Sequence, residues 1–93
     1  MEIAIIGTGN VGRALAAGLS AAGHDTVAGS RDPEATQLAA TEVVSQRAAA
    51  AQGDVVVLAV PAAVVADVAS ELGPALAGKP VIDPSNEYPT PET

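Results

Sequence analysis

Apolar residues follow two alternating patterns along the chain. Short apolar runs cover residues 2–6, 25–28, 42–45, 54–60 and 80–83, and most of them are bounded by Gly, Pro, Ser or Asp. Runs of this length, rich in Val, Ile and Ala, predict β-strands. Stretches with helical spacing or high alanine content cover 9–22, 32–40 and 47–52 and begin again at 61, and they predict helices. This alternation is typical of a parallel sheet with helices on both faces.

Residues that favour helix ends lie at the expected places. Gly23 follows the first predicted helix, where a helix commonly ends. Asp32 and Pro33 suit the start of the second, as an N-cap acid and a first-turn proline. We therefore expect a helix over 32–40. Gly73-Pro74 is expected to interrupt or end the last helix.

The order of elements predicts the topology of the sheet. Right-handed crossovers and the usual winding give the strand order 3-2-1-4-5, which is a doubly wound parallel α/β sheet of Rossmann type. A chain of 93 residues suits a single domain. We assign this domain to residues 1–86, and residues 87–93 are a polar, Pro-rich tail. The ligand is expected across the carboxyl ends of strands 2–6 and 54–60, where the winding direction reverses.

Composition narrows the range of partners. The net charge is −7 with four Lys and Arg residues, which argues against sequence-independent binding to nucleic acid or anionic membrane. The chain has no Cys, and no cluster of His, Asp or Glu suggests a metal site. No apolar run approaches the ~20 residues that span a bilayer, and the start of the chain does not resemble a secretory signal. A cytoplasmic location is expected.

The clearest motif follows the first strand directly. Gly7-Thr8-Gly9-Asn10-Val11-Gly12 matches G-x-G-x-x-G and opens the first helix. In such a turn, Gly7 allows the chain to leave the strand tightly and Gly9 lets a pyrophosphate approach the backbone. Gly12 allows close packing of the helix. The phosphates lie at the positive end of the helix dipole. The alternative is a plain glycine turn, but the strand, turn and helix together favour dinucleotide binding.

The end of the second strand indicates which dinucleotide binds. NAD-binding proteins usually carry Asp or Glu about 20 residues past the glycines, whereas this chain has Gly29-Ser30-Arg31. A guanidinium binds a 2′-phosphate through paired hydrogen bonds. The sequence therefore favours NADP, and the alternative for Arg31 is a solvated loop residue. Asp32 could reach a ribose instead, but its place before Pro33 favours helix capping.

These segments together resemble a known family. Residues 5–12, Gly23-His24, residues 29–31 and the run 55–61 are similar to the coenzyme F420-dependent NADP oxidoreductases. The resemblance extends over residues 1 to about 86. The six-transmembrane metalloreductases share the same motifs, and pyrroline-5-carboxylate reductase and prephenate dehydrogenase share the broader pattern less closely.

The resemblance implies a set of cofactor-binding residues. They are Gly7, Thr8, Gly9, Asn10, Val11 and Gly12 around the pyrophosphate, Ser30 and Arg31 at the 2′-phosphate, Ala59, Val60 and Pro61 beside the ribose and nicotinamide, and Asn86 near the nicotinamide end. Asn86 is alternatively an ordinary turn residue. The chain departs from the family because acidic residues, rather than a second basic one, follow Arg31. Family members are also about twice as long, and we expect the half that selects the substrate to lie outside this chain.

The family reaction is hydride transfer between a deazaflavin and the nicotinamide, in which the cofactors carry the chemistry. No catalytic residue is assigned here. The remaining candidates are better explained as structural, turn or capping residues: Ser20, His24, Asp54, Ser70, Asp83 and Tyr88. Two hypotheses stay open, namely the coenzyme domain of an NADP-dependent oxidoreductase that uses F420, and a non-catalytic NADP-binding module or truncated remnant. The last strand forms an open sheet edge, so we also predict a homo-oligomer.

Overall fold

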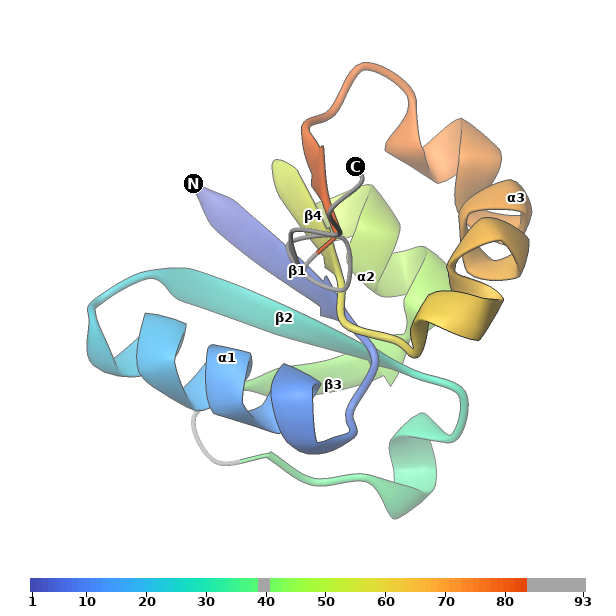
Figure 1. Ribbon diagram of the computed structural model, residues 1–93. Helices are drawn as coiled ribbons and strands as arrows, with labels where there is room; N and C mark the ends of the chain where they lie inside the picture. The colour runs from blue at the N-terminus through green and yellow to red at the C-terminus, as the bar shows by residue number, and fades with distance from the viewer. Residues whose placement is uncertain (39–40, 84–93) are drawn as a thin grey trace, which may run out of the picture.

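The fold is a five-stranded parallel sheet covered by helices on both faces (Figure 1). The computed structural model describes residues 1–38 and 41–83. The strands are β1 (Glu2–Ile6), β2 (Asp25–Ser30), β3 (Glu42–Ser45), β4 (Val55–Leu58) and β5 (Val81–Ile82). They lie in the order β3-β2-β1-β4-β5, and every neighbouring pair is parallel. The predicted fold class and strand order are confirmed.

The helices divide between the two faces of this sheet. They are α1 (Asn10–Ala21), α2 (Gln46–Gln52) and α3 (Val65–Leu76), with short 3₁₀ turns η1 (Pro33–Ala35) and η2 (Ala62–Val64). Figure 1 shows α1 on one side and α2 and α3 on the other. None of the helices within residues 1–38 and 41–83 has both the length and the apolar character needed to cross a membrane.

Alternation along β1 generates two apolar layers, as expected for a strand covered on both faces. Ile3 and Ile5 pack with Ala16 of α1 and Val57 of β4. The intervening side chains of β1 join the opposite layer, in which Ala, Val and Leu of the strands meet α2 and α3. The core is built from small aliphatic side chains, so that helices approach the sheet closely.

Several element bounds differ from the sequence prediction. Strand β2 continues through Ser30, because its last two residues pair with Val44 and Ser45 of β3. Strand β4 is shorter than predicted and ends at Leu58. Helix α3 contains Pro74 and runs to Leu76, whose side chain packs partly buried against the core. That packing favours the continuation of the helix past Gly73-Pro74.

The helix predicted over 32–40 is wrong in the described part of that range. Only the single turn η1 forms, and Asp32 makes no side-chain cap hydrogen bond. Thr36 has extended backbone angles, φ −117° and ψ 131°. Its hydroxyl donates to the carbonyl of Asp32 at 2.9 Å, the oxygen that the Thr36 amide would bond in an α-helix. A threonine side chain thus replaces the backbone bond and lets the chain leave the helix.

Candidate functional site

The carboxyl ends of β1, β2 and β4 meet at one edge of the sheet. The Gly7 amide donates to the Gly29 carbonyl at 2.9 Å, and the Ala59 amide donates to the Ile6 carbonyl at 2.8 Å. A pocket of about 320 Å³ opens at this edge. Its lining consists of residues that follow the strands: Gly7, Thr8, Gly9, Ser30, Arg31, Asp32, Gln46, Ala59, Val60 and Pro61. This is the edge at which the winding order places a ligand.

Two glycines of the motif are required by packing. Gly7 has φ +112°, a conformation that L side chains rarely adopt. A Cβ at Gly7 would overlap the Ala59 carbonyl oxygen. A Cβ at Gly12 would overlap the Gly7 carbonyl oxygen, because the first turn of α1 packs directly on the turn after β1. These two positions hold the strand end, the turn and the helix together.

Gly9 differs from both, because an added Cβ would meet nothing within 4 Å. Its backbone angles, φ −77° and ψ −163°, lie in the extended region that any residue adopts. The described fold therefore gives no reason for glycine at this position. Gly9 lines the pocket, and the space beside its Cα is open, so a ligand could approach its backbone. This arrangement fits a pyrophosphate.

The amino end of α1 begins directly after Gly9, which lines the pocket. Gly9 is the N-cap, no side chain caps the helix, and its first turn contains no acidic residue. The first amides of a helix have no intrahelical partner and carry the positive end of the dipole. In the absence of a capping side chain, these donors suit an anion.

Arg13 holds the turn from the side, a role that the sequence interpretation missed. Its Nε donates to the Thr8 carbonyl at 3.0 Å, and its Nη1 lies 3.3 Å from the Gln37 carbonyl. The side chain thereby joins the turn after β1 to the segment after η1. Only the tertiary path of residues 36–38 shows this contact, because the sequence gives no sign that Gln37 approaches α1.

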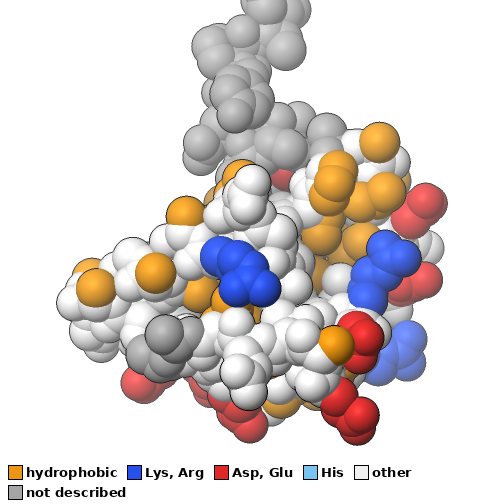
Figure 2. Space-filling model, turned by 90° about the horizontal axis from the view of Figure 1, so that it is seen from below, with side chains coloured by type: hydrophobic (Ala, Val, Ile, Leu, Met, Phe, Trp, Pro, Cys, Tyr) orange, Lys and Arg blue, Asp and Glu red, His pale blue; other side chains and the backbone are white. Residues whose placement is uncertain are grey.

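Arg31 is the cation of the pocket. Its side chain is exposed at the rim, and within residues 1–38 and 41–83 the guanidinium makes no hydrogen bond or ion pair. On the surface seen from below, Lys and Arg side chains are separated by uncharged and acidic groups (Figure 2). Among the described residues that line the pocket, Arg31 is the one Lys or Arg. An anion at this rim would therefore rely on its guanidinium and on backbone amides.

The Ser30 side chain is buried and hydrogen-bonded within the protein, unlike a hydroxyl that is free to bind a phosphate. It is 5% exposed, and its Oγ accepts from the Asp32 amide at 3.0 Å and lies 3.0 Å from Thr36 Oγ1. The hydroxyl is therefore engaged within the turn that follows β2. Arg31 lies between Ser30 and Asp32, which are joined by this hydrogen bond.

The pocket brings together most of the predicted residues, but not all. Asn10, Val11 and Gly12 begin α1 and are outside its lining, and Val11 is 56% exposed. Asn86 lies outside the described residues. The sequence interpretation did not place Gln46 in the site, although Gln46 directly follows β3. Applying the rule of carboxyl strand ends to that strand would have found it. His24 precedes β2, at the opposite edge of the sheet.

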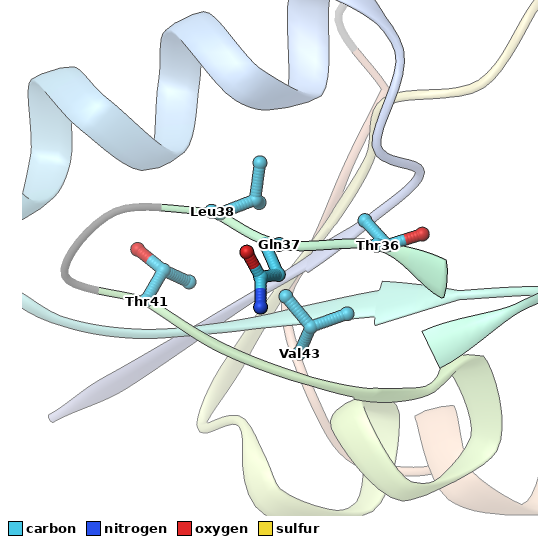
Figure 3. A pocket seen from close by; sticks show the side chains of 5 residues that line it. All are labelled: Thr36, Gln37, Leu38, Thr41 and Val43. Atoms are coloured by element: carbon cyan, nitrogen blue, oxygen red, sulfur yellow. The ribbon is translucent and has the colours of Figure 1, made fainter. Parts of the chain in front are cut away.

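A second, more open hollow of about 560 Å³ lies beside the first. It is lined by Thr36, Gln37, Leu38, Thr41 and Val43, between the segment after η1 and strand β3 (Figure 3). Thr36 lies between the two cavities, and its hydroxyl points away from the other labelled side chains.

A parallel sheet of order β3-β2-β1-β4-β5, with a glycine-rich turn after its central strand, places the domain in the Rossmann-type α/β class. The family model described as NADP oxidoreductase, coenzyme F420-dependent, matches residues 2–87. The chain belongs to this family, as its motifs indicated.

One solved structure gives a measure of the likeness. It comes from Arthrobacter sp. FB24, is described as a candidate F420-dependent NADP reductase, and matches with a TM-score of 0.81 and 32% identity. The match covers 89% of this chain and 44% of that one, so this chain spans less than half of its length. The comparison with curated proteins found no match.

Proposed function

We propose that the pocket at the ends of β1, β2 and β4 binds NADP(H), as the coenzyme domain of an oxidoreductase. The observation that carries this proposal is the open space above Gly9, beside the uncapped amino end of α1. Arg31 lies at the rim of the same pocket with no hydrogen bond or ion pair to residues 1–38 or 41–83. An elongated ligand with two anionic centres suits this arrangement.

Each part of the pocket then has a role in binding. Backbone amides of Thr8, Gly9, Asn10 and Val11 would hold the pyrophosphate. The Arg31 guanidinium would hold the 2′-phosphate through paired hydrogen bonds. Ala59, Val60 and Pro61 after β4, together with Asn86, would border the ribose and nicotinamide. The rigid turn around Gly7 fixes the distance between these parts.

A nicotinamide bound here would supply the hydride chemistry, and the protein would supply placement. Backbone amides at the turn after β1 would hold the pyrophosphate of the cofactor. The apolar residues after β4 would limit water next to the ring. By the likeness to its family, we propose coenzyme F420 as the redox partner. A further protein segment would hold F420 next to the nicotinamide site of this domain. We also propose a cytoplasmic location.

The phosphate selectivity is tested with Arg31→Ala. Hydrogen bonds to a charged group contribute about 1.5–3 kcal/mol when well formed. Because Arg31 is exposed, we expect a loss at the lower end of this range, roughly 10- to 30-fold in the dissociation constant for NADP. The constant for NAD should change less than about twofold, since NAD lacks the 2′-phosphate.

Arg47→Ala serves as the matched control, because it removes the same charge. Arg47 lies on α2 and contacts the Glu71 carbonyl at 3.2 Å, outside the pocket. Titration calorimetry of both variants and the parent chain, with NADP and with NAD, gives the comparison. Equal losses for the two cofactors in Arg31→Ala would refute the role of the guanidinium.

A non-catalytic NADP-binding module is the second candidate. It needs only the pocket at the ends of β1, β2 and β4, whose lining is described above. Mixing the chain with reduced F420 and NADP tests the second candidate. Turnover would refute the non-catalytic module, whereas NADP binding without turnover is expected of both candidates, because F420 is proposed to be held by a further segment. Self-association through β5, whose Val81 and Ile82 are 42% and 46% exposed, stays a prediction.

A further inference from the structure

The turn that presents Arg31 is held by side-chain hydroxyls. Thr36 Oγ1 donates to the Asp32 carbonyl at 2.9 Å and lies 3.0 Å from Ser30 Oγ. Ser30 Oγ in turn accepts from the Asp32 amide at 3.0 Å. Both backbone polar groups of Asp32 are thus bonded to this pair of hydroxyls.

The direction of each bond follows from counting protons. A threonine hydroxyl has one proton, and the Asp32 carbonyl can only accept, so Thr36 donates to Asp32. Thr36 has no further proton for Ser30. Ser30 must therefore be the donor in the bond between the two hydroxyls. With its single proton committed to Thr36, Ser30 has none to offer a phosphate in this arrangement.

This bonding pattern joins the turn to the end of β2. The 3₁₀ turn η1 adds backbone bonds from the Ala35 amide to the Asp32 carbonyl at 3.1 Å and from the Thr36 amide to the Pro33 carbonyl at 3.4 Å. Beyond η1 the chain is extended at Thr36. Ser30 is buried at the end of β2, and it anchors the pattern to the sheet. Thr36 closes it from the other side, with its hydroxyl pointing away from the second hollow (Figure 3). The Arg31 backbone is held between these two points.

We propose that Thr36 is a positioning residue for cofactor selectivity. It contacts no part of the ligand itself. Instead it fixes the Ser30–Asp32 backbone, so that the Arg31 guanidinium starts from a defined place at the 2′-phosphate. Preorganisation of this kind lowers the ordering cost of a flexible side chain on binding. The inference rests on the proposed function, because it assigns the residue to selectivity for NADP over NAD.

The test compares Thr36→Val with Thr36→Ser. Valine keeps the shape but removes both hydrogen bonds, whereas serine retains the hydroxyl. For Thr36→Val we expect the dissociation constant for NADP to rise roughly 3- to 30-fold, with less than a twofold change for NAD. Thr36→Ser should restore the parent selectivity to within about twofold. A residue that only stabilised the fold would change both constants together, or neither.

Thr26→Val provides the matched control. Thr26 Oγ1 lies 3.0 Å from Thr41 Oγ1, a hydroxyl pair of the same kind that contacts neither Arg31 nor Asp32. We expect this variant to keep the parent ratio of NADP to NAD affinity. A loss of selectivity in Thr26→Val as large as that in Thr36→Val would overturn the proposal.

Ser30→Ala extends the test and replaces Thr36→Val if that variant does not fold. It removes the bond between the two hydroxyls, which Thr36→Val also removes, together with the bond from the Asp32 amide. We therefore expect it to lose selectivity to a similar extent. The double variant should lose no more than the larger single loss, because both residues act as one unit. Losses that multiply would overturn the proposal, as they would indicate separate contacts.

If the parent chain shows no preference for NADP, the proposed function fails. If the parent chain prefers NADP and Thr36→Val keeps this preference in full, the proposed function stands and the inference about Thr36 fails.

Discussion

Gly12→Ala measures how closely α1 packs on the turn after β1. The new Cβ would overlap the Gly7 carbonyl oxygen and lie 2.9 Å from its carbonyl carbon. Both atoms belong to the backbone, so the helix or the turn must move. Added atoms in a packed site cost about 1–3 kcal/mol, and alanine returns about 1 kcal/mol of helix propensity. We therefore expect a net loss of up to about 2 kcal/mol in the free energy of unfolding.

Gly18→Ala is the control in the same helix. A Cβ at Gly18 would meet nothing within 4 Å, so only the propensity term remains, a gain of about 0.5–1 kcal/mol. For a domain of this size, 1 kcal/mol shifts Tm by roughly 4–8 °C. Thermal unfolding followed by circular dichroism should show Gly12→Ala melting below the parent chain and Gly18→Ala above it. An increase in Tm for both variants would refute the close contact.

Two further changes test the pocket. Gly9→Ala should remain folded, with at most about 1 kcal/mol lost at the N-cap, yet its NADP affinity should fall at least roughly tenfold because the Cβ occupies the approach to the backbone. Calorimetry showing unchanged affinity would remove the argument from the open space above Gly9. Asp32→Asn should raise NADP affinity about two- to fivefold at low salt, because it removes a negative charge beside Arg31. The gain should shrink as salt is added, and a gain that persists at high salt would contradict an electrostatic cause.

The strands were predictable because local and tertiary preferences agree in them. The run over 54–60 is Val-rich, and burial of β4 on both faces rewards the same residues. The strand order followed from the handedness of crossovers, which does not depend on detailed packing. Residues 32–40 show the opposite situation. Asp32 and Pro33 are good local signals for a helix, but the Thr36 hydroxyl offers a competing bond that a pattern of apolar positions cannot show.

The site was predictable wherever it depends on strand ends. Residues 7–9, Arg31 and residues 59–61 follow strands and Ser30 ends one, and all of them line one pocket. Side-chain contacts between distant segments were not predictable. Arg13 reaches the Gln37 carbonyl only because the segment after η1 runs beside α1. Ser30 was expected to face a phosphate, and its engagement with Thr36 appears only in three dimensions.

The two backbone hydrogen bonds that join β1 to β2 and β1 to β4 at the pocket bear on how much of the chain must be synthesised before the pocket can form. Gly7 bonds Gly29, and Ala59 bonds Ile6, so the lining is incomplete until the chain has been made at least as far as Pro61. A nascent chain that has only the glycine turn has no second wall with which to retain a dinucleotide. Once β4 has joined β1, a ligand in this pocket would contact the ends of three strands. Its binding free energy then adds to the stability of the whole sheet rather than to that of one loop.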